Sequence, residues 1–156
     1  MDPAFAAYTD SLQPSFAKLL ALPALTDGKI PIEAACPGIY LFSEGERHLY
    51  VGRTGNIRRR YDHHCAPGSS HRSAAFAFKL AREATDRKTP SYQKGADSRD
   101  GLISDPVFLN VFKAAKARIR QMAFRWVEEQ NPVRQALLEI YCTVVLNAHY
   151  NDFDNH

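Results

Sequence analysis

Tyrosine, arginine and histidine side chains, all able to act on a phosphate group, gather in one short part of this chain. Residues 37–60 read PGIYLFSEGERHLYVGRTGNIRRR and include Tyr40, Tyr50 and a run of arginines. A phenol can exchange a proton, and a guanidinium can hold two phosphate oxygens at once. These residue types therefore suit chemistry on the phosphate backbone of a nucleic acid.

Two short strands joined by a hairpin would bring the two tyrosines together. Apolar residues alternate with polar or aromatic ones over 39–42 and 48–51, which is the period of a strand with one buried face. Gly45 lies between the two runs and favours a turn there. Three registers are open, in which Tyr40 stands opposite Val51, Leu49 or Tyr50.

The hydrophobic pattern favours the register with a three-residue loop centred on Gly45. That register alone places the aliphatic residues on one face; they are Ile39, Leu41, Leu49 and Val51. It predicts that Tyr40 and Tyr50 are cross-strand neighbours, with Cβ atoms about 5 Å apart. An ordinary aromatic ladder on a half-exposed sheet would show the same pattern.

A local basic patch follows the second strand. The net charge of the whole chain is +3, which is a weak indication of an anionic partner. The patch is more informative, because its members lie close together in the sequence; they are Arg53, Arg58, Arg59, Arg60, His63 and His64. Such a cluster is expected at a nucleic-acid surface, and we assign phosphate contacts to Arg53, Arg58, Arg59 and His63. A solvated helix face is the alternative.

The bulk composition indicates a globular protein. The chain has 156 residues, of which 45% are hydrophobic and 24% charged, enough for one domain with its own core. We find no apolar run that could span a membrane and no signal peptide, so we expect a cytoplasmic location and no membrane partner. The three cysteines form no C-x-x-C pair, which predicts reduced thiols.

The remaining pattern predicts an α+β fold in which helices flank a small three-stranded, mainly antiparallel sheet. Helices are expected over about 10–21, 57–65, 70–85, 106–117 and 132–146, with a third strand over 119–127. Asn56 and Asn131 are good N-caps for two of these helices. We expect a single domain over residues 1–156, with a loop over 86–100.

One carboxylate stands alone in an apolar helix. Residues 136–146 read ALLEIYCTVVL, with Glu139 as their single charge. A helix that is apolar nearly all round is a buried one, and an unpaired buried carboxylate costs several kcal/mol. Such a group is normally paired, protonated or bound to a hard cation such as Mg²⁺. Exposure at the rim, or a structural bridge to an arginine, is the alternative.

Together these residues resemble the GIY-YIG endonucleases. Gly38-Ile39-Tyr40 matches the first signature tripeptide, and Tyr50-Val51-Gly52 matches the second with valine in place of isoleucine. The other matches follow in the family's order; they are Arg60, His64, Glu139 and Asn151. The resemblance covers about 36–65 and 132–156, which leaves about 66–130 as a family-specific insertion.

The resemblance implies a metal-dependent endonuclease that hydrolyses DNA. Tyr40 would be the general base, Tyr50 would position or relay a proton, and Arg60 would hold the scissile phosphate. The remaining implied roles are one Mg²⁺ or Mn²⁺ on Glu139, a proton shuttle or orienting contact from His64, and a stabilising hydrogen bond from Asn151. Gly38 and Gly52 would be structural glycines, the latter allowing close backbone approach.

One position departs from the family, and other readings stay open. Some relatives have lysine where this chain has Arg53, and arginine cannot act as a base at neutral pH. A module that binds nucleic acid without cutting it is the main alternative. A zinc site is another, although its residues match no strong spacing; they are His63, His64, Cys65 and His71. Cutting both strands would require two sites, as a homodimer would supply.

Overall fold

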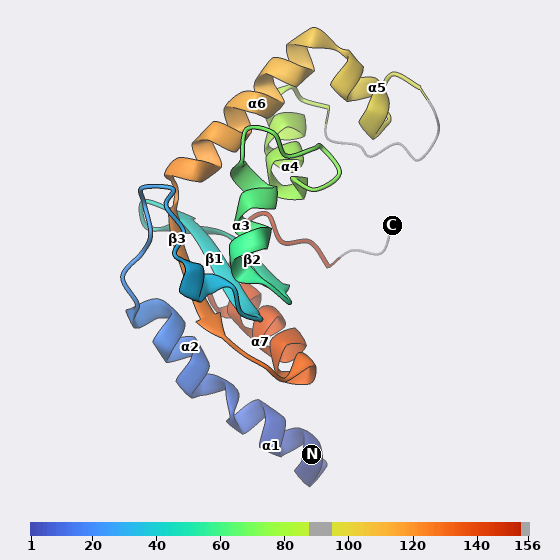
Figure 1. The fold of residues 1–156 in the computed structure, drawn as a ribbon. Helices are drawn as coiled ribbons and strands as arrows, with labels where there is room; N and C mark the ends of the chain where they lie inside the picture. The colour runs from blue at the N-terminus through green and yellow to red at the C-terminus, as the bar shows by residue number, and fades with distance from the viewer. Residues whose placement is uncertain (88–94, 154–156) are drawn as a thin grey trace. The chain divides into compact units, whose positions relative to one another are not determined.

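The structure, a computed structural model, describes residues 1–87 and 95–153, with the helices and strands shown in Figure 1. In chain order they are α1 (Pro3–Asp10), α2 (Leu12–Ala21), the 3₁₀ helix η1 (Ile32–Ala34), β1 (Gly38–Glu44), β2 (Arg47–Thr54), α3 (Ile57–Cys65), α4 (Ala75–Ala84), α5 (Arg99–Ser104), α6 (Pro106–Gln121), β3 (Ala123–Glu128) and α7 (Pro132–Val145). The chain divides into two units. The first, here called the sheet unit, is Met1–Arg60 with Met122–His156, and the second is Tyr61–Gln121. The predicted insertion overlaps the second unit, and the single domain stays a prediction.

Within the described residues, three strands form an open antiparallel sheet in the order β2-β1-β3. β1 therefore pairs on both sides, with β2 along one edge and β3 along the other. Figure 1 shows α7 and α2 beside this sheet. The predicted α+β class and the three-stranded antiparallel sheet are confirmed.

The predicted hairpin register is wrong. A two-residue turn follows Glu44, which pairs with Arg47, and Gly45 in that turn has φ of 60°. Two-residue hairpin turns favour glycine in this left-handed region. The register then shifts between Phe42 and Ser43, where Leu49 is the extra residue of a β-bulge. The bulge was not predicted, because a uniform register was assumed.

Beyond the bulge, Tyr40 stands opposite Gly52, and Phe42 stands opposite Tyr50. The two tyrosines therefore share one face of the sheet as diagonal neighbours, not as a directly opposed pair. Their rings are 6.4 Å apart between centroids, with an angle of 35° between planes.

The central strand is buried on both faces, whereas the alternation of apolar residues predicted a strand with one buried face. On one face, aliphatic side chains of β1 and β2 pack with α2 and α7; the cluster includes Ile39, Leu41, Val51, Phe16, Leu19, Leu138 and Cys142. On the other face, Tyr40, Phe42 and Phe124 are each at most 2% exposed. The aromatic face of β1 is therefore buried as well as its aliphatic face.

Two predicted N-caps are confirmed. The Asn56 side chain accepts a hydrogen bond from the Arg59 N–H at 2.9 Å, at the start of α3. The Asn131 side chain accepts from Val133 and Arg134 at 2.9 and 3.1 Å, where α7 begins. Both caps satisfy backbone donors that a helix start leaves open.

Other helix and strand bounds differ from the prediction. The expected helix over 10–21 is α2, and α1 before it was missed. The expected helix over 70–85 begins at residue 75, and α5 begins inside the expected loop over 86–100, part of which (88–94) lies outside the described residues. The expected strand over 119–127 starts at 123, because α6 runs on to residue 121.

The expectation that α7 is buried nearly all round is wrong. Its positions Ile140, Val144 and Val145 are 49%, 67% and 52% exposed. The helix packs one stripe against the sheet and leaves apolar residues on its other side. An apolar sequence can thus belong to a one-sided helix.

The second unit packs α4 against α6. The Phe78 ring lies 5.2 Å from that of Phe108 and 6.2 Å from that of Phe112, between centroids. The buried Lys116 ammonium donates to the carbonyls of Pro67 and Ser69, each at 2.8 Å. These bonds hold the loop before α4 on α6. Over the whole described part of the chain, no helix has the length and apolar character needed to cross a membrane.

Candidate active site in the sheet unit

The Tyr40 ring lies across Gly52 on the neighbouring strand. A Cβ atom added to Gly52 would lie 2.2 Å from the Tyr40 hydroxyl oxygen and 2.3 Å from its Cζ. No side chain fits there without moving the ring. Gly52 was predicted to allow close approach of backbone. In the structure, the group that approaches it closely is the Tyr40 side chain.

Arg60 approaches the same hydroxyl from α3. Its Nε donates to the Tyr40 oxygen at 3.3 Å. The first turn of α3 is fixed by the Asn56 cap and by the Ile57 N–H, which donates to the Cys36 carbonyl at 2.9 Å. A guanidinium is thus held against a buried phenol by a short, capped helix.

Tyr50 completes a group of three polar side chains. Tyr50 is partly exposed, and its ring lies beside that of Tyr40. The Arg60 guanidinium also donates a hydrogen bond to the Tyr50 hydroxyl. Burial raises the pKa of Tyr50, and Arg60 lowers it by a smaller amount. Tyr50 is the more accessible of the two phenols, since Tyr40 is 2% exposed.

Burial dominates the protonation of Tyr40. It raises the pKa of Tyr40 well above the ordinary value, and the neighbouring Tyr50 raises it further, while Arg60 opposes both. One partly buried guanidinium therefore does not offset the desolvation of this phenol. Tyr40 carries its proton at neutral pH in this structure.

Glu139 lies in α7 and is paired with Arg53 of β2. The Arg53 Nε donates to Glu139 Oε2 at 3.1 Å, with side chains 49% and 28% exposed. Burial raises the pKa of Glu139, and Arg53 partly offsets this. Glu139 is close enough for its charge to raise the pKa values of Tyr40 and Tyr50. The arginine bridge considered from the sequence is therefore present, and the acid lies within electrostatic range of both phenols.

Asn151 forms hydrogen bonds along the outer edge of β2. The Val51 N–H donates to Asn151 Oδ1, and Asn151 Nδ2 donates to the Val51 carbonyl, both at 2.8 Å. The Tyr150 N–H also donates to the Leu49 carbonyl at 2.9 Å. An amide side chain thus replaces the missing neighbouring strand beside the Tyr50-Val51-Gly52 segment, which positions that segment without touching the phenols.

Gly38 allows β1 and β3 to approach each other closely. A Cβ atom at Gly38 would lie 2.0 Å from the Val127 carbonyl oxygen. Both glycines assigned from the sequence therefore occupy positions where a side chain would collide.

The other predicted site residues lie on α3 with Arg60. Arg58 and Arg59 are exposed on α3, and His63 is partly exposed in the second unit. His64 also belongs to the second unit, where it is fully buried with its ring 6.4 Å from that of Phe76. The predicted role of His64 in the site stays a prediction.

Phe124 and Trp126 lie beside Tyr40 on the same face of the sheet and were not predicted as site residues. The Phe124 ring lies 5.9 Å from that of Tyr40 and 5.8 Å from that of Trp126. Aromatic side chains therefore cross the sheet from Tyr50 to Trp126. The signal was the period of two in the predicted third strand, which puts 124 and 126 on one face.

The site offers a metal ion one acidic ligand, the Glu139 carboxylate. Across residues 1–87 and 95–153 there is no group of three His, Cys, Asp or Glu side chains that could hold an ion, so the zinc alternative is wrong. Glu139 Oε1 accepts no hydrogen bond from the described residues, and the carboxylate is partly exposed. One carboxylate oxygen with waters and substrate oxygens suits Mg²⁺ or Mn²⁺, so the donor set fits one such ion.

Comparison with known proteins adds nothing to this assignment, since no family model, curated protein or solved structure matches the chain. The resemblance to the GIY-YIG endonucleases stays a prediction from its residues.

Proposed function

We propose that this protein is a metal-dependent endonuclease that hydrolyses phosphodiester bonds in DNA, in the manner its resemblance to the GIY-YIG endonucleases implies. The observation that carries the proposal is the contact between Arg60 and the Tyr40 hydroxyl, at 3.3 Å, beside Tyr50. Residues from three separate elements meet there, and their chemistry is what phosphate cleavage requires.

The guanidinium of Arg60 would bind the phosphate at the bond to be cut. It would offset negative charge as that charge develops on the phosphate oxygens. The same guanidinium already faces both phenols, so a phosphate bound to it would lie beside a phenol that, once ionised, can take a proton from the attacking water. Tyr50, being more exposed, would position that water.

Tyr40 would accept the proton from water. Its raised pKa makes the phenolate rare at neutral pH but a strong base once formed. Arg60 favours that ionised form, and a divalent cation near Glu139 would favour it further. Cleavage is therefore expected to be slow at neutral pH and faster in mildly alkaline solution.

Glu139 would hold one Mg²⁺ or Mn²⁺. When bound, such an ion neutralises phosphate charge and lowers the pKa of a coordinated water. The Arg53 side chain would leave Glu139 Oε2 and become available to the DNA backbone, as its exposed position on β2 permits. Arg58 and Arg59 would add phosphate contacts from the exposed side of α3.

Incubation of the protein with supercoiled plasmid and Mn²⁺ or Mg²⁺ tests the proposal. We expect nicked circles that disappear when EDTA is added, and no cutting by Glu139→Ala. Glu46→Ala, which removes an exposed acid from the hairpin turn, is the matched control and should cut normally. Normal cutting by Glu139→Ala would remove that residue from the mechanism.

A non-cleaving nucleic-acid-binding module is the second candidate function. Two observations favour it: Tyr40 is 2% exposed, and Glu139 is already paired with Arg53. DNA binding that depends on Arg58 and Arg59, with an intact plasmid under every metal condition, would select this function. Linear products in place of nicked circles would instead point to paired sites, as in a homodimer.

A further inference from the structure

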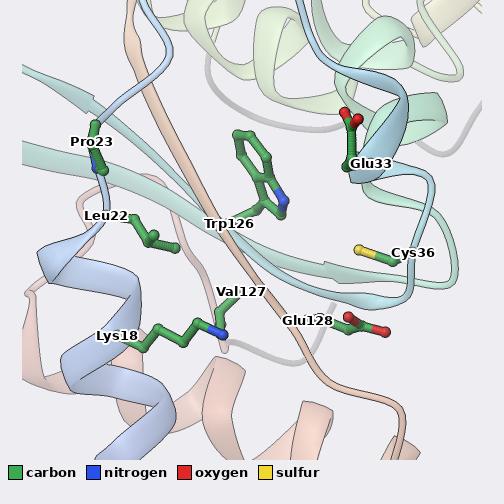
Figure 2. A pocket seen from close by; sticks show the side chains of 8 residues that line it. All are labelled: Lys18, Leu22, Pro23, Glu33, Cys36, Trp126, Val127 and Glu128. Atoms are coloured by element: carbon green, nitrogen blue, oxygen red, sulfur yellow. The ribbon is translucent and has the colours of Figure 1, made fainter.

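The pocket beside β3 does not select a single class of ligand. Its volume is about 450 Å³, in the range of small-ligand sites. Figure 2 shows the Trp126 indole on one side of β3, with Lys18 and Val127 on the other. The carboxylates of Glu33 and Glu128 also line the pocket, so its charged groups have both signs. The exposed face of α6 differs, because its charges share one sign.

The second unit carries the excess positive charge of this protein. Residues 61–121 include eleven Lys and Arg against six Asp and Glu, a net charge of +5, whereas the rest of the chain has a net charge of −2. Positive charge concentrated on one unit is expected where a protein binds a nucleic acid. A nucleic-acid contact is therefore expected on a surface of the second unit.

The surface of α6 divides into a buried side and a basic side. The buried residues are Phe108, Phe112, Ala115, Lys116 and Ile119. The exposed residues lie on the opposite side; they are Pro106, Val107, Asn110, Lys113, Ala114, Ala117, Arg118, Arg120 and Gln121. The 16 residues of α6 include no Asp or Glu. Asp105, the acid just before the helix, pairs with Arg87 at 3.1 Å, so the basic side has no acid of its own.

A central strip runs along the exposed side of α6. Successive residues of an α-helix turn by about 100° around the axis, which places two amides and two alanines within an arc of about 60°; they are Asn110, Ala114, Ala117 and Gln121. Lys113 falls at one border of this central strip, and Arg118 falls at the other. Cations therefore flank a strip of amides and small side chains.

This arrangement matches the major groove of B-form DNA. The groove is about 12 Å wide and admits an α-helix, with a phosphate backbone along each side. Lys113 and Arg118 would face the two backbones, while Asn110 and Gln121 would face the base edges between them. The rise from Asn110 to Gln121 is about 17 Å at about 1.5 Å per residue, which corresponds to about five base pairs at about 3.4 Å each.

A solvated helix face is the alternative, and the charge pattern opposes it. Solvated faces normally combine acids and bases at spacings of three or four residues, which stabilises the helix. In α6, Lys113 and Lys116 stand three residues apart, and Lys116 and Arg120 stand four apart, with no acid between them. Burial, and then the charge of Lys113, lower the pKa of Lys116. A bound polyanion would offset this repulsion between like charges.

We propose that α6 binds duplex DNA in its major groove, with Lys113 and Arg118 on the two phosphate backbones and Asn110 and Gln121 on base edges. Both amides match adenine, whose N6 and N7 form a donor–acceptor pair, and the alanines of the central strip can contact thymine methyl groups. Duplex RNA does not fit, because its major groove is deep and narrow. That the bound DNA is also the substrate rests on the proposed nuclease function, whereas binding itself does not.

Fluorescence anisotropy of a short labelled DNA duplex measures binding by the full chain. The titrations contain EDTA, which prevents metal-dependent cutting, and are repeated at several salt concentrations. Lys113→Ala and Arg118→Ala should each reduce the slope of log affinity against log salt by about 0.9, the value for one lost phosphate contact. Lys29→Ala removes an exposed lysine from the sheet unit, so it is the matched control and should keep the wild-type slope.

Selection of duplexes from a random pool by the wild-type chain tests the base contacts. The selected sequences should share A·T pairs within about five base pairs. Asn110→Ala and Gln121→Ala should each weaken binding to a selected site about 5- to 150-fold, the range for a lost bidentate contact to a base, with an unchanged salt slope. Substituting 7-deazaadenine, which lacks N7, should weaken binding by the wild-type chain but not by the variant that carries both substitutions.

Four results would each overturn the proposal. The first is an absence of duplex binding, and the second is an unchanged salt slope in both Lys113→Ala and Arg118→Ala. The third is a selected site to which the wild-type chain and the double variant respond equally when 7-deazaadenine is substituted. The fourth is duplex RNA bound as tightly as duplex DNA of the same sequence. All the variants alter exposed residues, and circular dichroism checks their folding.

Plasmid cutting separates this proposal from the nuclease function. DNA binding that depends on α6, without cutting in Mn²⁺ or Mg²⁺, would contradict the proposed function and leave the groove contact assigned. Metal-dependent cutting by the wild-type chain, with wild-type affinity and salt slope in every α6 variant, would overturn the groove contact and leave the proposed nuclease function in place.

Discussion

Gly52→Ala is expected to disrupt the site through a collision that the structure locates. The new methyl group would lie 2.2 Å from the Tyr40 hydroxyl oxygen and 2.3 Å from Cζ, where ordinary contacts begin at 3.4 Å. The ring would have to retreat by more than an ångström. It is 2% exposed and has Phe42 and Phe124 each at 5.9 Å between ring centroids, so its neighbours must move too.

The expected loss is about 2–4 kcal/mol of unfolding free energy. Overpacking a filled interior costs about 1–3 kcal/mol, and displacing Tyr40 from Arg60 loses a hydrogen bond worth about 1 kcal/mol. For a chain of this length, that loss lowers Tm by roughly 4–16 °C. The cleavage rate should fall as well, since the displaced phenol is the proposed base.

Urea unfolding of four variants tests this reasoning. Gly55→Ala is the matched control, because a Cβ atom there meets nothing within 4 Å. Tyr40→Leu removes the ring that collides, so Gly52→Ala should cost much less in that background, with a coupling of at least about 1 kcal/mol. Equal stability of Gly52→Ala and Gly55→Ala, or no coupling with Tyr40→Leu, would refute the assignment.

The remaining predictions concern the edge of β2 and the two ionisable groups. Asn151→Ala removes both hydrogen bonds to Val51 and should cost about 1–3 kcal/mol in urea unfolding; unchanged stability would mean that the edge is held by other contacts. Because the pKa of Tyr40 is raised, its phenolate fraction grows about tenfold per pH unit from about pH 7 to pH 9, and the cleavage rate should rise with it. The same slope in a residually active Tyr40→Phe would reassign the base. Because the pKa of Glu139 is raised above 4.5, metal-dependent cleavage should be lost, as pH falls, at a higher pH than for an ordinary glutamate. More Mn²⁺ should shift that loss to lower pH, and a loss unaffected by Mn²⁺ would exclude Glu139 as the ligand.

Local signals in the sequence predicted much of the sheet unit. Asn56 and Asn131 cap helices at the predicted positions, since a cap depends on its own side chain and the next few backbone groups. The alternation of apolar residues also predicted the strands β1 and β2. The hairpin register was not predicted, because the bulge at Leu49 changes pairing without changing the apolar pattern.

Contacts between distant residues account for the other differences. The alternating pattern of 119–127 did not show that α6 continues to residue 121, because an apolar residue at the end of a helix also fits the start of a strand. The Arg53–Glu139 pair joins residues 86 positions apart, so its geometry needed coordinates, although a bridge to an arginine was foreseen. The burial of His64 beside Phe76 arises from packing within the second unit, which the spacing of His64 after Arg60 does not show.

The central claim is that the phenols of Tyr40 and Tyr50, the Arg60 guanidinium and the Glu139 carboxylate form one phosphodiesterase site around a single ion. Anomalous diffraction from crystals of the Tyr40→Phe variant, bound to DNA and Mn²⁺, tests it most directly. We predict one manganese ion on the Glu139 carboxylate, with a backbone phosphate between it and Arg60. Manganese bound elsewhere, with Glu139 still paired to Arg53, would contradict the claim.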